Sequence, residues 1–109
     1  MRPSFTSLLL LVLAASPAPP DALRLEAARN VGLASLEEGN LDEARRRFEE
    51  VRRLAPAEPL GWANGAVAAL RSKDLAAAGK LLEEALRRAP GDGRVLALEG
   101  VRRELAGDA

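Results

Sequence analysis

Apolar residues return at helical spacing along most of the chain. The clearest stripe has apolar side chains three or four positions apart, at Leu41, Ala44, Phe48 and Val51. The same stripe appears again further along, at Leu75, Ala78, Leu82 and Ala85. Spacing of this kind places all members on one side of an α-helix. The pattern therefore predicts two amphipathic helices that must each bury one face.

These two stripes belong to a longer repeat. An interval of 34 residues separates the members of the pairs Leu41 and Leu75, Gly39-Asn40 and Lys73-Asp74, Ala44 and Ala78, and Pro56 and Pro90. A period of about 20–50 residues marks a unit that buries its apolar face only by stacking on a copy of itself. Stacked repeats expose long surfaces, so the chain is expected to be a docking surface rather than a catalyst.

Each copy has the pattern of two helices joined by a short turn. The first copy covers residues 25–58 and the second covers residues 59–92. A third copy begins at residue 93, and one more helix is predicted from about Arg94 to Leu105. Its polar residues Glu99, Arg102, Arg103 and Glu104 suit a half-repeat, residues 93–106, that closes the open end of the stack. A truncated product is the alternative interpretation.

Local signals agree with the predicted helices. Asn40 and Asp74 are good N-cap residues, and Glu43 three positions after Asn40 is typical of a capping box. Pro56 and Pro90 follow the second helix of each copy and prevent its continuation. Close approach of neighbouring helices is expected at four small residues, namely Gly32, Ala44, Ala66 and Ala78.

These motifs resemble the tetratricopeptide repeat family. The first copy carries the family pattern at Val31-Gly32, Ala44, Phe48 and Pro56, and the second carries it at Trp62, Ala78, Leu82, Ala85 and Pro90. The copies depart from it with Ala28 and Ser35 in the first, and with Gly65-Ala66 and Ala69 in the second. The resemblance covers residue 25 to about residue 106. It implies an all-α fold, a short right-handed solenoid of two full helix-turn-helix repeats and a C-terminal capping helix.

The resemblance also implies a binding face on the concave side, which the first helix of each copy builds. The expected partner-binding residues are Arg29, Leu33, Leu36, Ala63, Asn64, Val67, Leu70, Arg94, Ala97 and Val101. The middle of this surface is aliphatic and its ends are charged, which suits an extended or helical peptide. The alternative is that its large aliphatic residues pack helix against helix and leave no groove.

Some family members hold a C-terminal carboxylate at five positions of this face. Those positions are Arg29, Leu33, Asn64, Arg94 and Leu98 in this chain. Two arginines and an asparagine are suitable donors, because a guanidinium binds a carboxylate through two parallel hydrogen bonds. The two leucines donate nothing, so the resemblance implies an incomplete clamp at most.

The first 20 residues follow a different pattern. One basic residue, Arg2, is followed by an apolar run from Leu8 to Ala15 and then by small residues and prolines. This is the layout of a secretory signal peptide, and the run is shorter than the roughly 20 residues of a membrane span. We expect cleavage after about Ala15, a proline-rich leader up to Pro20 and a domain over residues 21–109 that Asp21 caps. An uncleaved, membrane-tethered N-terminus is the alternative.

Composition argues against catalysis and against cofactors. The chain has no histidine, cysteine or tyrosine, which removes the usual nucleophile–base pairs and most zinc sites. No glycine-rich loop precedes a helix as in phosphate-binding motifs. No catalytic, cofactor-binding or metal-binding residue is therefore predicted, and no small-molecule substrate.

Charge gives no sign of nucleic-acid binding. The chain has 16 basic and 16 acidic residues, whereas nucleic-acid-binding domains are usually basic. Arginines cluster at 45–47, 52–53 and 87–88, but acidic residues alternate with them. Glu49 and Glu50 lie within helical pairing distance of Arg45, Arg46 and Arg53. These clusters are expected to be a surface of ion pairs, with an anion or membrane-surface contact as the alternative.

Taken together, the sequence predicts a non-catalytic interaction module or scaffold that binds a protein or peptide. The excess of arginine over lysine is typical of GC-rich bacterial genomes, so with the signal-peptide pattern it indicates the bacterial cell envelope, periplasmic or secreted. Contact with the membrane is then only transient, through the signal peptide. The alternative function is a structural, self-associating repeat protein that forms homo-oligomers.

Overall fold

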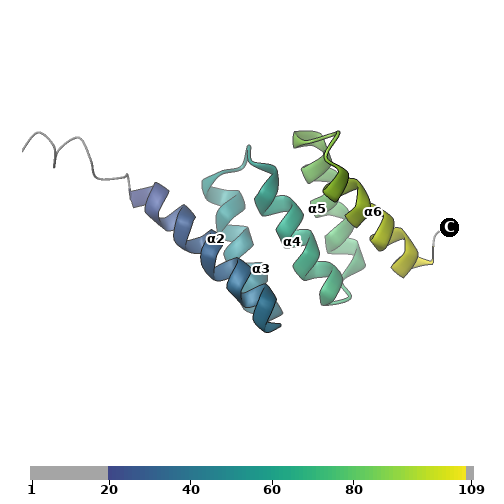
Figure 1. Ribbon diagram of the computed structural model, residues 1–109, viewed down its shortest axis with the longest axis horizontal. Coiled ribbons are helices and arrows are strands. Elements are labelled where there is room, and N and C mark those ends of the chain that lie inside the picture. The colour runs from purple at the N-terminus through teal and green to yellow at the C-terminus, as the bar shows by residue number, and fades with distance from the viewer. Residues whose placement is uncertain (1–19, 108–109) are drawn as a thin grey trace, which may run out of the picture.

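The computed structural model describes residues 20–107, which form five helices. These are α2 (Pro20–Glu38), α3 (Leu41–Leu54), α4 (Pro59–Arg71), α5 (Leu75–Arg88) and α6 (Gly93–Ala106). Between residues 20 and 107 there is no strand. Successive helices lie next to one another along the molecule (Figure 1). The predicted all-α repeat solenoid is confirmed, and the helix expected from about Arg94 to Leu105 is α6.

The start of the first helix differs from the prediction. Helix α2 begins at Pro20, which was expected to end an extended leader, and Asp21 lies in the first turn rather than at the cap. Proline is well suited to the first helical position, because its fixed φ matches the helix and its missing N–H would have no partner there. The predicted signal peptide and its cleavage after Ala15 lie outside the described residues.

The N-caps of the second helices are those predicted from sequence. The side-chain oxygen of Asn40 accepts a hydrogen bond from the Glu43 N–H at 3.5 Å, and Asp74 accepts one from the Ala77 N–H at 3.2 Å. The reciprocal half of the expected capping box is absent. The carboxylate of Glu43 instead accepts a hydrogen bond from Arg47 at 2.7 Å.

A left-handed residue recurs in every copy at the turn after the first helix. The φ angles of Gly39, Lys73 and Gly107 are 78°, 64° and 82°. These three positions lie one repeat period apart. Glycine adopts this backbone conformation without steric cost, whereas a lysine side chain is strained in it. The backbone of the repeat therefore favours glycine at this position, and the second copy has a lysine there instead.

The turn at Lys73 has the two hydrogen bonds of a Schellman motif. The N–H of Lys73 donates to the carbonyl of Leu70 at 3.0 Å, and the N–H of Asp74 donates to the carbonyl of Ala69 at 2.9 Å. The turn at Gly39 has bonds with the same two spacings, at 3.1 Å and 2.8 Å. In both turns, these two hydrogen bonds satisfy the last carbonyl groups of the first helix of the copy in the same way.

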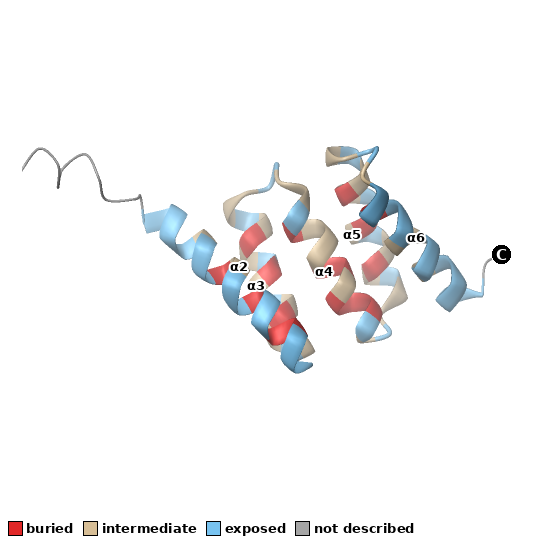
Figure 2. Cartoon of the chain, viewed as in Figure 1, coloured by how far each residue is buried: buried red, intermediate tan, exposed pale blue. Residues whose placement is uncertain are grey.

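The core lies between the paired helices, where the buried residues cluster (Figure 2). Phe48, Leu82, Val51 and Val95 are its largest fully buried side chains. Alanines and glycines fill most other buried positions, so the helix backbones approach closely. A Cβ atom added to Gly32 would lie 2.9 Å from two ring carbons of Phe48. The small residues expected at such contacts, Gly32, Ala44, Ala66 and Ala78, are all buried.

Candidate ligand groove

A mostly apolar cavity with a volume of about 410 Å³ lies between α4 and α6. Its lining is mostly apolar and consists of Pro59, Leu60, Ala63, Asn64, Val67, Asp92, Arg94, Val95, Ala97, Leu98 and Val101. The walls are well suited to a ligand because Leu60 and Val101 remain exposed although they are large and apolar. A cavity of this size accommodates a few apolar side chains of a peptide.

A second cavity of about 260 Å³ continues the first toward α2. It is lined by Arg29, Leu33, Phe48, Val51, Leu60, Gly61, Asn64 and Arg94. Leu60, Asn64 and Arg94 line both cavities. The two cavities therefore form one groove across α2, α4 and α6, which we call the groove below.

Most of the partner-binding residues predicted from sequence line this groove. Ala63, Val67, Ala97 and Val101 line the larger cavity, Arg29 and Leu33 line the smaller one, and Asn64 and Arg94 line both. Three further lining residues, Leu60, Val95 and Leu98, extend the apolar wall.

Leu36 and Leu70, which were also predicted to bind the partner, do not line the groove. Their exposed fractions are 8% and 6%, and they pack in core clusters with Ala44 and Ala78 respectively. Both residues lie on the border between the groove face and the core face of their helix. A leucine at such a border turns inward, because full burial of its side chain gains about 1.5–3 kcal/mol.

The charged residues of the groove are partly neutralised by internal carboxylates. Arg29 Nη2 contacts both carboxylate oxygens of Glu58, while the buried Arg29 Nε has no hydrogen-bond partner. The Arg94 side chain is 82% exposed, and its Nε lies 3.7 Å from Asp92 Oδ1. The backbone N–H of Arg94 holds the pKa of Asp92 below its ordinary value. Arg94 is therefore the more accessible cation of the groove, whereas Arg29 is already paired with Glu58.

This arrangement bears directly on the carboxylate clamp. The three donors Arg29, Asn64 and Arg94 do lie around one cavity, together with Leu33. An incoming carboxylate would nevertheless compete with Glu58 for Arg29. Sequence reasoning missed Glu58, because the pair joins residues 29 positions apart that meet only when α4 packs beside α2.

The sequence and the fold agree with a known family. A family model described as Tetratricopeptide repeat matches residues 35–100, which is more than half of the 109-residue chain. The chain belongs to the tetratricopeptide repeat family. Tetratricopeptide repeats are generally protein–protein interaction modules and are typically non-catalytic. The resemblance noted in the sequence is thus confirmed.

Among solved structures, the tetratricopeptide repeat chain is similar to the TPR2B domain of yeast Sti1 in its complex with pHsp70. The TM-score is 0.75 at 19% sequence identity, and the match covers 77% of this chain and 67% of that one. At this identity the similarity establishes the fold. No curated protein matches the sequence.

Most arginines in the clusters of this tetratricopeptide repeat protein form ion pairs, mainly with partners that the sequence did not indicate. Arg45 pairs with Asp74 at 2.9 Å and Arg46 with Glu43 at 2.6 Å, rather than with Glu49 or Glu50. Hydrogen bonds from these arginines hold the pKa values of Asp74 and Glu43 below their ordinary values. Arg53 does pair with Glu50, at 3.8 Å. These contacts favour the interpretation of the clusters as an ion-paired surface.

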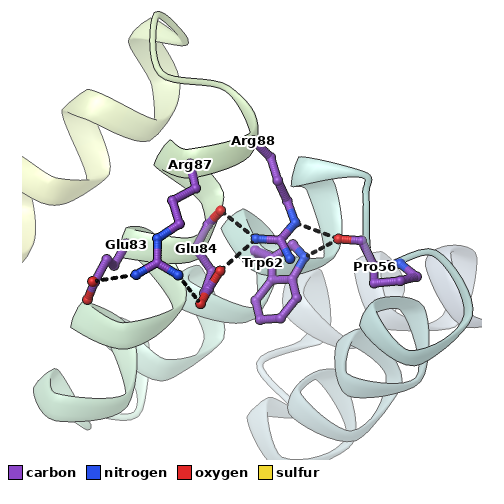
Figure 3. A network of polar contacts seen from close by, with 6 residues as sticks. All are labelled: Pro56, Trp62, Glu83, Glu84, Arg87 and Arg88. Carbon is purple, nitrogen blue, oxygen red and sulfur yellow. Dashed lines mark hydrogen bonds and ion pairs between the residues drawn. The ribbon is translucent and has the colours of Figure 1, made fainter.

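Trp62 connects the two repeats in a way that its motif position did not reveal (Figure 3). Its Nε1–H donates to the carbonyl of Pro56 at 3.0 Å. The guanidinium of Arg88 lies 4.1 Å from the centre of the Trp62 ring and donates to the same carbonyl. Glu84 accepts from Arg88 at 2.8 Å, and this bond lowers the pKa of Glu84. The network ties the loop between the repeats to α4 and α5.

Residues 20–107 contain no group of three or more histidine, cysteine, aspartate or glutamate side chains that could hold a metal ion. No helix of this region is both long and apolar enough to cross a membrane.

Proposed function

We propose that the chain is a non-catalytic interaction module that binds an extended or helical peptide segment of a protein partner in the groove. The observation that carries the proposal is the continuous, largely apolar groove across α2, α4 and α6. A peptide would insert apolar side chains against Leu60, Val67 and Val101. Asn64 and Arg94 lie where the two cavities meet and would orient its polar groups.

The comparison with solved structures supports a protein partner. The TPR2B domain of yeast Sti1 has the same fold and was solved in complex with pHsp70. Peptide recognition by a helical groove uses a few apolar anchors and fixed polar contacts. The groove of this chain offers both, with an apolar wall and an exposed Arg94 at its centre.

We propose further that the module acts in the bacterial cell envelope. The support is the pattern of residues 1–20, with an apolar run from Leu8 to Ala15 after Arg2. Fractionation of cells that express the whole chain, with N-terminal sequencing of the product, tests this. Export with a new N-terminus at about Ser16 would support the proposal, an intact membrane-bound chain would support tethering, and an intact chain in the cytosol would refute both.

The binding proposal is tested with the whole chain as bait in an envelope extract. Leu60→Glu places a charge in the groove, and Leu96→Glu is the matched control. Both leucines are exposed, but Leu96 does not line either cavity. A protein held by wild type and Leu96→Glu and lost with Leu60→Glu supports a groove ligand. A binding segment mapped on that protein should then bind as a synthetic peptide with the same dependence on Leu60.

Two results would refute the proposal. The first is a set of captured proteins that is the same for all three baits. The second is a captured protein whose segments bind equally well to wild type and to Leu60→Glu. Helicity of the variants, measured by circular dichroism, shows that the comparison involves folded chains.

A further inference from the structure

Helix α6 exposes a side that is buried in α2 and α4, the first helices of the other two copies. Ala28 and Gly32 of α2 are buried, and so is Ala66 of α4, whereas the matching residues of α6, Leu96 and Gly100, are exposed. Figure 2 shows α6 as largely exposed, and Val95 is its buried residue. Most of the surface of α6, including its groove side, is therefore accessible to another molecule.

The groove side of α6 has a regular pattern. Its four members are three, four and three positions apart, at Arg94, Ala97, Val101 and Glu104. This is the spacing of the contact positions in a pair of packed helices. All four are exposed, and the first three line the groove. We call this stripe the α6 seam.

The α6 seam is complementary to itself in the antiparallel direction. Arg94 and Glu104 are equally far from position 99, and so are Ala97 and Val101. When two copies of α6 lie antiparallel about that point, Arg94 of each copy faces Glu104 of the other. The small Ala97 likewise faces the larger Val101. A two-fold contact of this kind repeats every favourable pair twice.

The placement of these two charges has no explanation within α6 itself. The helix dipole favours acidic residues in the first turn and basic residues in the last turn, and α3 follows this rule. Arg94 and Glu104 have the opposite arrangement. They do not pair with each other, because ten residues of helix separate them by about 15 Å, and Arg94, whose side chain is 82% exposed, has the Asp92 carboxylate at 3.7 Å as its ion-pair partner. An antiparallel partner helix neutralises both.

We propose that two copies of the chain associate through antiparallel α6 helices, and that this contact covers the groove. Part of this inference rests on the proposed function: a groove that binds a peptide is then regulated by self-association, because the second copy occupies the same surface. Helix α6 has 14 residues and is about 21 Å long. One helix pair of this length buries less than the roughly 1,200 Å² of a stable interface, so the dimer is expected to be weak and reversible.

Charge reversal tests the proposed pairing directly. Sedimentation velocity of the whole chain over a wide concentration range would compare wild type, Arg94→Glu, Glu104→Arg and the double variant Arg94→Glu/Glu104→Arg. Arg103→Glu is the matched control, since Arg103 is an exposed residue of α6 that lies off the seam. Both single changes agree with the helix dipole, so a loss of association would not reflect loss of α6.

We expect wild type and Arg103→Glu to dimerise with the same affinity. Each single reversal should weaken dimerisation about fivefold to tenfold, because two exposed ion pairs become repulsive in every dimer. The double variant should return to within about threefold of wild type, since the pairs form again with exchanged signs. Wild type that stays monomeric, or a double variant as weak as the single ones, would overturn the proposal.

The same variants separate this inference from the proposed function. If the groove binds a peptide and the α6 contact covers it, that peptide should dissociate the wild-type dimer. Peptide binding by a chain that never dimerises would refute the inference and leave the proposed function intact. Dimerisation rescued by the double variant, in a chain without a groove ligand, would refute the proposed function and leave the α6 contact intact.

Discussion

Replacing the one left-handed lysine by glycine should stabilise the protein. Lys73 has φ of 64° at the position where the other copies have Gly39 and Gly107. The left-handed conformation costs a residue with a side chain about 1–2 kcal/mol. Glycine removes that cost, but it returns about 0.4–1 kcal/mol because the unfolded chain becomes more flexible. With the middle value of each range, the expected net gain for Lys73→Gly is about 0.8 kcal/mol.

The reverse substitution at the matching turn is the control. No atom lies within 4 Å of the place where a Cβ atom of residue 39 would be, so Gly39→Lys changes the backbone strain without a steric clash. It should cost about what Lys73→Gly gains. The double variant should be close to wild type in stability, because it only moves the strained residue from one repeat to the other.

Thermal unfolding followed by circular dichroism provides the measurement. A change of 1 kcal/mol shifts the Tm of a domain of 60–100 residues by about 4–8 °C, so Lys73→Gly should raise the Tm by about 3–6 °C. A Tm that is unchanged or lower for Lys73→Gly would refute the reasoning. The same conclusion would follow if Gly39→Lys had no effect, since the strain at this position would then be negligible.

Three other predictions concern packing, pH and the connection between the repeats. Ala44→Leu or Ala78→Leu should overpack the helix contacts and lower the free energy of unfolding by about 1–3 kcal/mol, measured by urea denaturation; a wild-type midpoint would contradict the buried positions of these alanines. Arg45 lowers the pKa of Asp74 from 3.8, so this pair stabilises the protein fully above pH 3.8 and less as the pH falls through the lower folded-state pKa. Urea midpoints of wild type and Asp74→Asn should therefore converge on acidification, and a constant difference would refute the prediction. Arg88→Ala should expose Trp62, shift its fluorescence to longer wavelength and cost about 1 kcal/mol; an unchanged spectrum would show that the stacking is absent in solution.

The repeat period accounts for the part of the fold that the sequence could predict. Copies in phase with each other fix where helices start and end, and Asn40 and Asp74 confirm the expected caps. The predicted beginning of α2 was wrong, because the sequence alone does not distinguish a proline that ends an extended leader from a proline that begins a helix. The left-handed backbone at Lys73 could not be predicted, because lysine is an ordinary polar residue that gives no sign of this conformation.

The candidate groove could be predicted only in part, because the period does not describe contacts between copies. Leu36 and Leu70 were assigned to the groove by family position, but their place on the border of the helix face let them turn into the core. Arg29 of α2 pairs with Glu58 at the start of α4, and Trp62 and Arg88 both donate to the Pro56 carbonyl of the preceding copy. Such contacts depend on how neighbouring repeats are rotated, and that angle follows from packing rather than from spacing.

The order in which the helices touch has a consequence for how the molecule opens. Most contacts join each helix to its neighbour in sequence, and further contacts join α4 to α2 and to α6. Such local topology favours rapid folding. Helix α6 has Val95 as its one buried residue, whereas each of the other four described helices has at least three. Amide hydrogens in α6 should exchange with solvent sooner than those of α4, without unfolding of the whole chain. The helix that forms one wall of the groove is thus also the one that can detach at least cost, which gives a bound segment a path of release.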